Sequence, residues 1–280
     1  MDKSIMEVEA PPPESKIHAL LNVDISSSYI TPRGLNVENQ GVIFQPLILF
    51  FFDLYKSETA FIRGLTLTTG VWNSIHTKPS GAVASEFNET DPIVGLTFNL
   101  PSGFKIDTFF TAFISQTDSY DTSTNFSLKL TYNDTAFGSF SINPFVEYWA
   151  EISKKATVVF NPATSSEGYY FVLGATPTYQ FTTIPLKIEV PLFANFVSDN
   201  FYQQFDGSDG GSGFALVSAQ IKASTPLSFI PSTYGFWTLY AGVKYYYLDN
   251  TGLLDGNQVL ATSQRDRNLV QFSGGISIFF

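Results

Sequence analysis

The chain of 280 residues carries few charges and many aromatic side chains: Asp, Glu, Lys and Arg make up 14% of it, and Phe, Trp and Tyr make up 16%. Because about 25% of residues are charged in an ordinary globular protein, this chain has too few charges to cover a surface that faces only water. It contains no cysteine, which excludes disulfides and thiolate metal sites, and its formal charge of −10 argues against nucleic acid as a partner.

Residues 1–16 are predicted to form a flexible tail. They are acidic and contain three consecutive prolines, Pro11 to Pro13, which favour an extended segment without a core. The longest apolar run that follows, Pro46 to Phe52, ends at Asp53 and has the length of a strand. A membrane-spanning helix needs about 20 apolar residues, so none is predicted.

From Ile17 onward, apolar and polar residues alternate in segment after segment. Phe126, Leu128 and Leu130, for example, alternate with Ser127 and Lys129. A period of two indicates strands with one apolar face, not helices. The pattern predicts twelve strands, near residues 17–30, 41–54, 60–77, 92–100, 103–117, 124–133, 142–153, 168–181, 184–197, 213–224, 234–248 and 267–280.

The predicted connections alternate between tight turns, such as 100–103 and 182–185, and mostly longer loops, such as 154–167 and 198–212. An even number of strands with short turns on one side and long loops on the other is typical of an outer-membrane barrel. A soluble β-sandwich or lipocalin-like barrel would alternate too. The polar face of these strands, however, is rich in Ser, Thr, Gly and Asn, which suits a wet lumen better than a surface in bulk water.

The last strand carries a more specific resemblance. Phe272, Ile276 and Ile278 alternate up to Phe280, and this ending resembles the C-terminal strand by which assembly machinery recognises bacterial outer-membrane β-barrel proteins. The resemblance implies the outer membrane of a Gram-negative bacterium, with periplasmic termini and with membrane lipid and that machinery as partners. We therefore expect an all-β chain: a periplasmic tail at 1–16 and a single transmembrane antiparallel barrel of about twelve strands at 17–280, with short periplasmic turns and longer extracellular loops.

Aromatic residues are expected where such a barrel meets the lipid headgroups. Tyr169 and Tyr179 lie ten residues apart on one face of a strand, as do Trp237 and Tyr247. Ten residues of a tilted strand span roughly 23 Å, close to the ~25 Å apolar band of a membrane barrel. Together with Phe280, these four residues form the predicted interface set.

The more polar face of each strand is assigned to the lumen. Inward acids and inward lysines are equal in number on this assignment, so strong selection of ions by charge is not expected. Most of the formal negative charge is expected on loops at the outer mouth, on acids that include Glu38, Glu86, Glu89 and Asp91. The predicted channel-lining residues are Asp24, Trp72, His76, Lys105, Asp107, Phe109, Phe113, Lys129, Phe145, Glu147, Trp149, Glu151, Lys187, Glu189, Lys222, Tyr240 and Lys244. Several of them are large, so we expect a narrow lumen.

No catalytic, metal or cofactor site is predicted. Ser74 and His76 share a face, but their Cβ atoms should lie roughly 6–7 Å apart, which is long for a Ser–His hydrogen bond, and no acid is placed beside them. The segment from Asp206 to Gly213 has the spacing of a calcium-binding glycine-rich loop but lacks a third ligand. A flexible outer loop is the better interpretation of that segment.

These features favour a passive or weakly selective channel for small solutes, whose identity the sequence does not reveal. The aromatic lumen side chains either stack on planar or sugar-like solutes or pack the interior. The alternatives are a closed barrel with a structural or partner-binding role, which would dock a periplasmic protein through residues 1–16 or present its loops, and an outer-membrane lipid hydrolase.

Overall fold

The computed structural model describes residues 16–80, 85–118, 120–134, 138–157, 166–262 and 265–280. The predicted tail therefore lies outside the described residues, apart from Lys16. None of the helices within the described ranges is long and apolar enough to cross a membrane.

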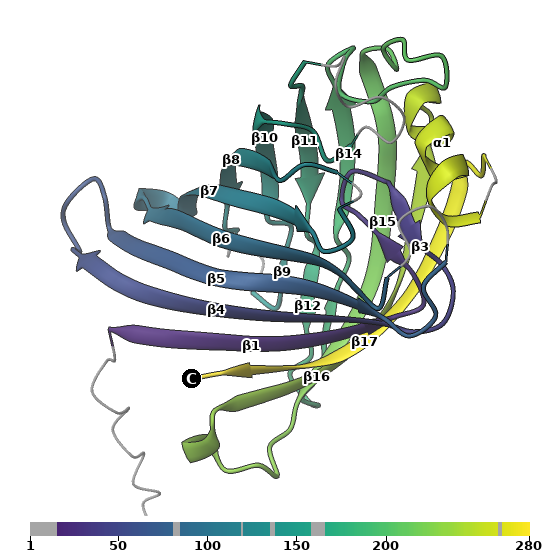
Figure 1. The fold of residues 1–280 in the computed structure, drawn as a ribbon. Helices are drawn as coiled ribbons and strands as arrows, with labels where there is room; N and C mark the ends of the chain where they lie inside the picture. The colour runs from purple at the N-terminus through teal and green to yellow at the C-terminus, as the bar shows by residue number, and fades with distance from the viewer. Residues whose placement is uncertain (1–15, 81–84, 119, 135–137, 158–165, 263–264) are drawn as a thin grey trace, which may run out of the picture.

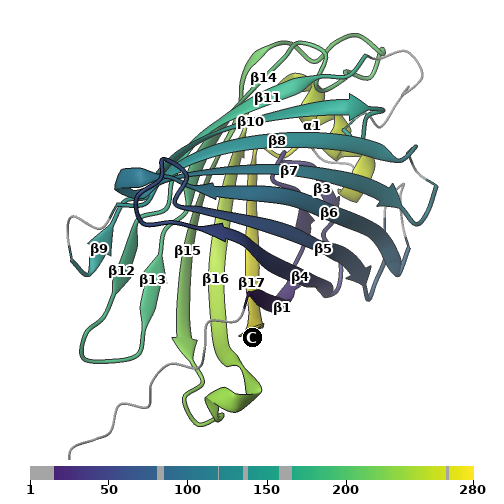
Figure 2. The same cartoon turned by 90° about the vertical axis from the view of Figure 1, so that its left-hand side faces the viewer.

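The described chain is all-β apart from short helical segments, and its main sheet closes into an antiparallel barrel (Figures 1 and 2). The predicted count of twelve wall strands is confirmed for this part of the chain. In order around the wall they are β1 (Ile17–Ser26), β4 (Ile43–Lys56), β5 (Gly64–His76), β6 (Phe87–Asn99), β7 (Phe104–Ser115), β8 (Ser123–Tyr132), β9 with β10 (Phe140–Ser141 and Pro144–Ser153), β11 with β12 (Tyr169–Ala175 and Thr178–Gln180), β13 with β14 (Lys187–Glu189 and Leu192–Val197), β15 (Gly213–Pro226), β16 (Phe236–Leu248) and β17 (Asn268–Phe279).

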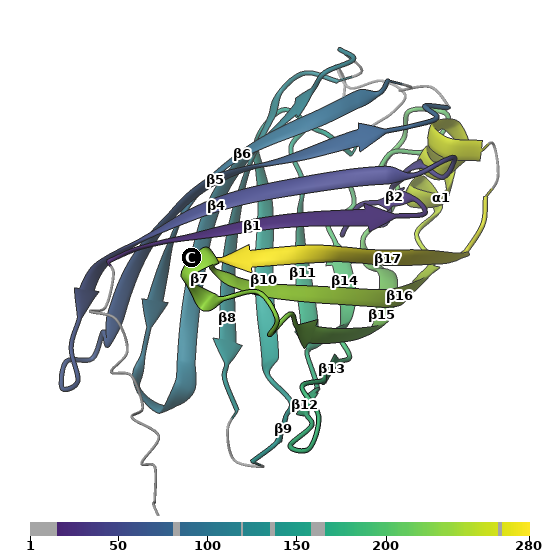
Figure 3. The same cartoon turned by 90° about the horizontal axis from the view of Figure 1, so that it is seen from below.

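The first and last strands close the barrel. β1 pairs with β17 so that Val23 lies opposite Ile276, and the two strands run side by side in Figure 3. The pairing continues to the end of the chain, because the backbone N–H of Phe280 donates to the carbonyl of Ala19 at 2.9 Å and the N–H of Ala19 donates back at 3.2 Å. Phe280 therefore belongs to the barrel seam.

Three neighbouring wall strands are interrupted close to one level. Asn143 separates β9 from β10 and has a φ of 49°, while Pro177 and Pro191 lie in the breaks between β11 and β12 and between β13 and β14. Proline cannot donate to a strand ladder, so the regular pairing stops at these positions. A backbone hydrogen bond still links two of the three breaks, since Val190 N–H donates to Pro177 O at 2.8 Å.

The outward face of the barrel is apolar and exposed, as the period of two predicts. Leu128, Leu173, Leu239 and Ile276 are all exposed large apolar side chains, whereas Lys129, next to Leu128, points inward. An apolar band around a closed sheet is unsuited to water and matches lipid.

The two ends of the barrel differ. The turn end carries the shorter connections, of which Pro101–Gly103 forms a 3-10 turn. The loop end carries the longer ones, including the helix α1 (Thr251–Asn257) and the following helical segment Gln258–Thr262. Asn250 caps α1, because its side-chain oxygen accepts from Leu253 N–H at 3.0 Å.

The first long connection folds into the barrel. The strand predicted at 17–30 ends at Ser26, and residues 27–42 form what we call the inner hairpin, with the short strands β2 (Tyr29–Ile30) and β3 (Asn36–Glu38). Figure 1 shows β3 between the wall and α1. At its tip Gly34 has a φ of 85°, and a Cβ atom there would lie 2.6 Å from Leu216. Only glycine fits at this position without strain.

The inner hairpin completes a hydrophobic core at the loop end of the barrel. Side chains from the wall, the hairpin, the loops and α1 are buried together there, an arrangement that resembles the interior of a soluble protein. The core consists of Tyr29, Ile30, Leu35, Val37, Ile43, Tyr170, Val172, Val197, Phe201, Tyr202, Ala215, Leu216, Tyr246, Leu248, Leu253, Leu254 and Leu260.

Candidate functional site

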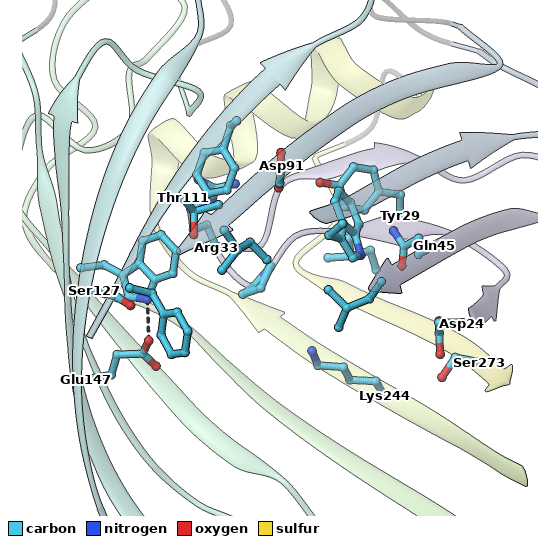
Figure 4. Close-up of a pocket in the computed structure, with 18 of the residues that line it drawn as sticks. Asp24, Tyr29, Arg33, Gln45, Asp91, Thr111, Ser127, Glu147, Lys244 and Ser273 are labelled. Carbon is cyan, nitrogen blue, oxygen red and sulfur yellow. Dashed lines mark hydrogen bonds between the residues drawn. The ribbon is translucent and has the colours of Figure 1, made fainter. Parts of the chain in front are cut away.

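A cavity of about 550 Å³ lies inside the barrel next to the inner hairpin. Figure 4 shows side chains that converge on it from the hairpin and from both sides of the wall. Seven predicted lumen residues line it: Asp24, Trp72, Phe109, Phe113, Glu147, Trp149 and Lys244. Residues that were not predicted to face the lumen also line it, including Tyr29, Ile30, Pro32, Arg33, Gln45, Leu47, Leu49, Asp91, Ile93, Gln220, Gln271 and Ser273.

One wall of the cavity is aromatic. The rings of Phe113 and Trp149 stack with centroids 6.2 Å apart and an interplanar angle of 10°, and Trp149 continues the stack onto Tyr170 at 5.9 Å and 12°. The guanidinium of Arg33, from the inner hairpin, covers the Phe113 ring at 4.2 Å. The hairpin is thus seated on this aromatic stack through a cation–π contact.

The hairpin is also held by its backbone carbonyls. Asn195 Nδ2 donates to Pro32 O at 3.0 Å, the Tyr202 hydroxyl donates to Arg33 O, and Asn257 Nδ2 donates to Gly34 O at 2.9 Å. These donors come from the wall, from a loop and from α1. The carbonyls of Arg33 and Gly34 belong to buried residues and would be costly without a donor, so these bonds hold the hairpin in its observed position.

Two acids expected on the outer loops are instead buried inside the barrel. β6 begins at Phe87 rather than near residue 92, so Glu89 and Asp91 are strand residues on the inward face, and both are buried. The Tyr29 hydroxyl donates to Glu89 at 2.9 Å. Glu38, also expected at the mouth, is buried as well, and the backbone N–H and hydroxyl of Ser80 donate to its carboxylate at 2.5 and 2.6 Å.

Glu89 and Asp91 lie close to two titratable side chains of the inner hairpin, Arg33 and Tyr29. Burial alone would lower the pKa of Arg33, but neighbouring phenols and the charges of Glu89 and Asp91 outweigh it and raise that pKa. The guanidinium therefore stays charged. Burial, reinforced by Glu89 and Asp91, raises the pKa of Tyr29 well above its usual value, so its hydroxyl remains a hydrogen-bond donor.

Other predicted lumen residues lie away from the cavity and mostly form pairs. Lys105 contacts Asp107 at 3.0 Å, and Glu189 contacts Lys187 at 3.1 Å and Lys222 at 4.0 Å. Some lysines also cover rings: Lys129 lies 3.9 Å from the centroid of Phe145, and Lys222 lies 4.5 Å from that of Tyr240. Ion pairs therefore neutralise several of the charges that the sequence places in the lumen.

Ser74 and His76 are hydrogen-bonded, contrary to the expectation that they lie too far apart. Ser74 Oγ lies 2.9 Å from His76 Nε2, because the imidazole reaches well beyond its Cβ toward the neighbouring serine. A bulge in β6 opposite Ser74 adds local twist. Both side chains are buried, and the Tyr29 ring lies 6.0 Å from that of His76. The pair therefore lies beneath the inner hairpin, without access to a lipid substrate in this arrangement.

Glu151, the remaining predicted acid, forms a buried ion pair with Lys155 at 3.2 Å. Glu151 also accepts from Gly168 N–H at 2.7 Å and from the Thr157 hydroxyl at 3.0 Å. Lys155 donates to the carbonyls of Ser166 and Asn200. This cluster ties two of the long loops to the end of β10.

The arrangement is known from solved proteins, although neither a protein-family model nor a curated protein sequence matches the chain. An outer membrane channel from Pseudomonas putida F1 is similar over the full length of both chains, with 9% identity and a TM-score of 0.52. The fold is that of an outer-membrane β-barrel. The NanC porin (10% identity, 92% of this chain and 98% of that one, TM-score 0.48) and LpxR from Salmonella typhimurium (9% identity, 93% and 100%, TM-score 0.46) are also similar.

This β-barrel places the predicted interface aromatics on its outer surface. Tyr169, Tyr179 and Phe280 are exposed, and Trp237 and Tyr247 are partly exposed. The Trp237 indole N–H donates to Tyr234 O at 2.9 Å, so one edge of this ring is polar and the other faces outward, as suits a headgroup region.

The loop from Asp206 to Gly213 is organised by local hydrogen bonds. Asp206 accepts from the backbone N–H and hydroxyl of Ser208 at 2.9 and 2.6 Å, and these bonds lower the pKa of its carboxyl group. Among the described residues, no group of three or more His, Cys, Asp or Glu side chains is arranged to hold a metal ion.

Proposed function

We propose that this outer-membrane β-barrel is a narrow channel for small solutes in the outer membrane of a Gram-negative bacterium, with its loop end outside the cell and its turn end in the periplasm. The cavity carries the proposal. A twelve-stranded barrel is wide enough to hold more than packed side chains, and this one encloses about 550 Å³ lined by aromatic, amide and charged groups. Toward the turn end, the side chains of Lys105, Lys187 and Lys222 remain 33%, 40% and 32% exposed, which supports access from the periplasm.

The inner hairpin is the constriction in this proposal. Its residues border the cavity, and the hydrophobic core beside it fills the loop end. The path is therefore closed in the observed arrangement, and passage requires the hairpin to shift. Since the lumen charges are largely paired, we expect low conductance with weak preference between cations and anions.

Planar-bilayer recording of the refolded protein tests this function. We expect small, infrequent openings for the parent chain, and a severalfold larger, steady conductance when residues 29–37 are replaced by two glycines. Lys154→Met, an exposed change at the same end of the barrel, is the control and should behave like the parent. A hairpin-deleted barrel that folds but never conducts would contradict the channel.

The second candidate is a closed barrel with a structural or partner-binding role. The buried core at the loop end favours it, because such packing also suits a permanently sealed barrel. Its signature in the same recordings is the absence of conductance from both the parent and the hairpin-deleted protein.

A further inference from the structure

Three polar side chains form a row on one wall of the cavity. Gln220 of β15 lies opposite Lys244 of β16, and Lys244 lies opposite Gln271 of β17 in the strand register. All three line the cavity, and Figure 4 shows the Lys244 side chain running into it. Cross-strand neighbours on one face have Cβ atoms about 5 Å apart. Gln271 Nε2 already donates to Ser28 O at 2.6 Å, but a side-chain amide has two N–H donors, so the row can still present several N–H groups to one small group.

Lys244 differs from the other lumen lysines in its partners. Lys105 and Lys187 each contact a carboxylate at 3.0 and 3.1 Å. Within the part of the chain that the structure describes, no carboxylate lies within 4.0 Å of Lys244. Its ammonium instead lies 4.6 Å from the Tyr246 ring and 5.3 Å from the Phe193 ring.

The nearby acid Asp24 is already engaged. Asp24 lies level with Tyr240, four residues along β16 from Lys244, and accepts from the Tyr240 hydroxyl at 2.9 Å. Lys222 also acts on it electrostatically, and Lys244 does so more weakly, from beyond ion-pair distance. A lysine in a protein-enclosed lumen with no carboxylate against it is a ready site for an anion.

The opposite side of the cavity is mainly aromatic, and the guanidinium of Arg33 covers the Phe113 ring there at 4.2 Å. Phe109 and Phe113 project from β7, which lies six strands away from β16 around a ring of twelve, and Trp149 stacks on Phe113. The acid on that side, Glu147, accepts from the Trp149 indole at 2.6 Å and lies opposite Lys129 in the register. A solute that spans the cavity therefore meets N–H donors at one end and ring surfaces at the other.

We propose that the cavity binds small monocarboxylates with a flat apolar body. The carboxylate accepts hydrogen bonds from Lys244 and from the amides of Gln220 and Gln271, while the body lies toward Phe109 and Phe113. The proposal rests on the channel function only for the route by which the solute arrives. Strongly hydrated ions should bind poorly at the aromatic wall, because they would lose bound water there without gaining new hydrogen bonds.

Calorimetric titration of the refolded, detergent-solubilised barrel with benzoate tests this site, with the neutral isostere benzamide as the paired ligand. We expect benzoate to bind about 10- to 100-fold more tightly than benzamide, as charge-assisted hydrogen bonds usually allow. Lys244→Met should remove that difference. Lys105→Met is the matched control: it removes a lumen lysine that contacts Asp107 at 3.0 Å and does not line the cavity, so it should leave the benzoate preference intact.

Each outcome decides the matter. Equal binding of benzoate and benzamide by the parent protein overturns the proposal, and so does equal loss of benzoate binding in the two lysine variants. If Lys244→Met does not refold, the comparison of benzoate and benzamide binding by the parent protein still tests the proposal. The assay needs no membrane, so a barrel that binds benzoate without conducting contradicts the channel alone, and one that conducts without preferring benzoate contradicts this site alone.

Discussion

Replacing Lys155 by methionine tests whether a buried ion pair holds the loop end together. The Lys155 ammonium lies 3.2 Å from the Glu151 carboxylate, and the two side chains are only 1% and 2% exposed. Methionine keeps most of the length of the side chain but leaves the charge of Glu151 buried without its counterion. Removal of one partner from a buried pair costs about 3–5 kcal/mol of the free energy of unfolding.

The neighbouring lysine is a matched control. Lys154 also lies 3.2 Å from an acid, Asp121, but these side chains are 60% and 74% exposed. Water screens such a pair, so Lys154→Met should lower the free energy of unfolding by less than about 1 kcal/mol. Reversible urea unfolding in phospholipid vesicles, followed by tryptophan fluorescence, measures both variants.

The combined change Glu151→Gln and Lys155→Met should cost less than Lys155→Met alone, because it removes the uncompensated charge. The glutamine oxygen can still accept from Gly168 N–H, and its NH2 group can donate to the Thr157 hydroxyl oxygen. The reasoning is refuted if Lys155→Met and Lys154→Met lower the free energy of unfolding equally. Such a result would mean that water reaches Glu151 freely once the lysine is gone.

Three further predictions concern the lumen, the register and the seam. Changing Phe113 and Trp149 together to alanine removes the aromatic stack under the hairpin, so single-channel conductance should rise severalfold with little change in cation preference; a variant as closed as its parent would locate the block elsewhere. A spin label at Leu128 should be relaxed by lipid-dissolved oxygen, whereas one at Lys129 should not. The reverse pattern would mean that Lys129 faces lipid and Leu128 faces the lumen. Deletion of Phe280 removes two backbone hydrogen bonds to β1, so the amount of assembled barrel in membrane fractions should fall sharply, and undiminished levels would contradict this role.

The barrel could be predicted from the sequence because its wall obeys one simple rule. Residues such as Leu128 and Lys129 alternate between lipid and lumen, and every predicted strand overlaps a wall strand of the structure. Boundaries were less predictable. Glu89 and Asp91 were assigned to a loop because polar residues dominate the start of β6, whereas in a lumen-facing register polar residues are compatible with a strand.

The inner hairpin was missed for a related reason. Tyr29 and Ile30 continue the alternation of β1, so the pattern alone extends that strand to residue 30. A signal was nevertheless present: Pro32 and Gly34 are turn residues, and the apolar Leu35 and Val37 follow them in a segment expected to face water. Apolar residues on both sides of a turn in an outer loop indicate a hairpin that has a surface to pack against.

The chain separation between the inner hairpin and α1 constrains the order in which the barrel matures. Asn36 N–H donates to Asn257 Oδ1 at 2.8 Å, a bond between residues 221 positions apart. Contacts of such long range form late, because the chain between them must be ordered first. The hairpin can settle onto α1 only after the chain between them has been ordered, so the lumen is plugged late in folding, at the same stage as the β1–β17 seam, which also joins the two ends of the chain.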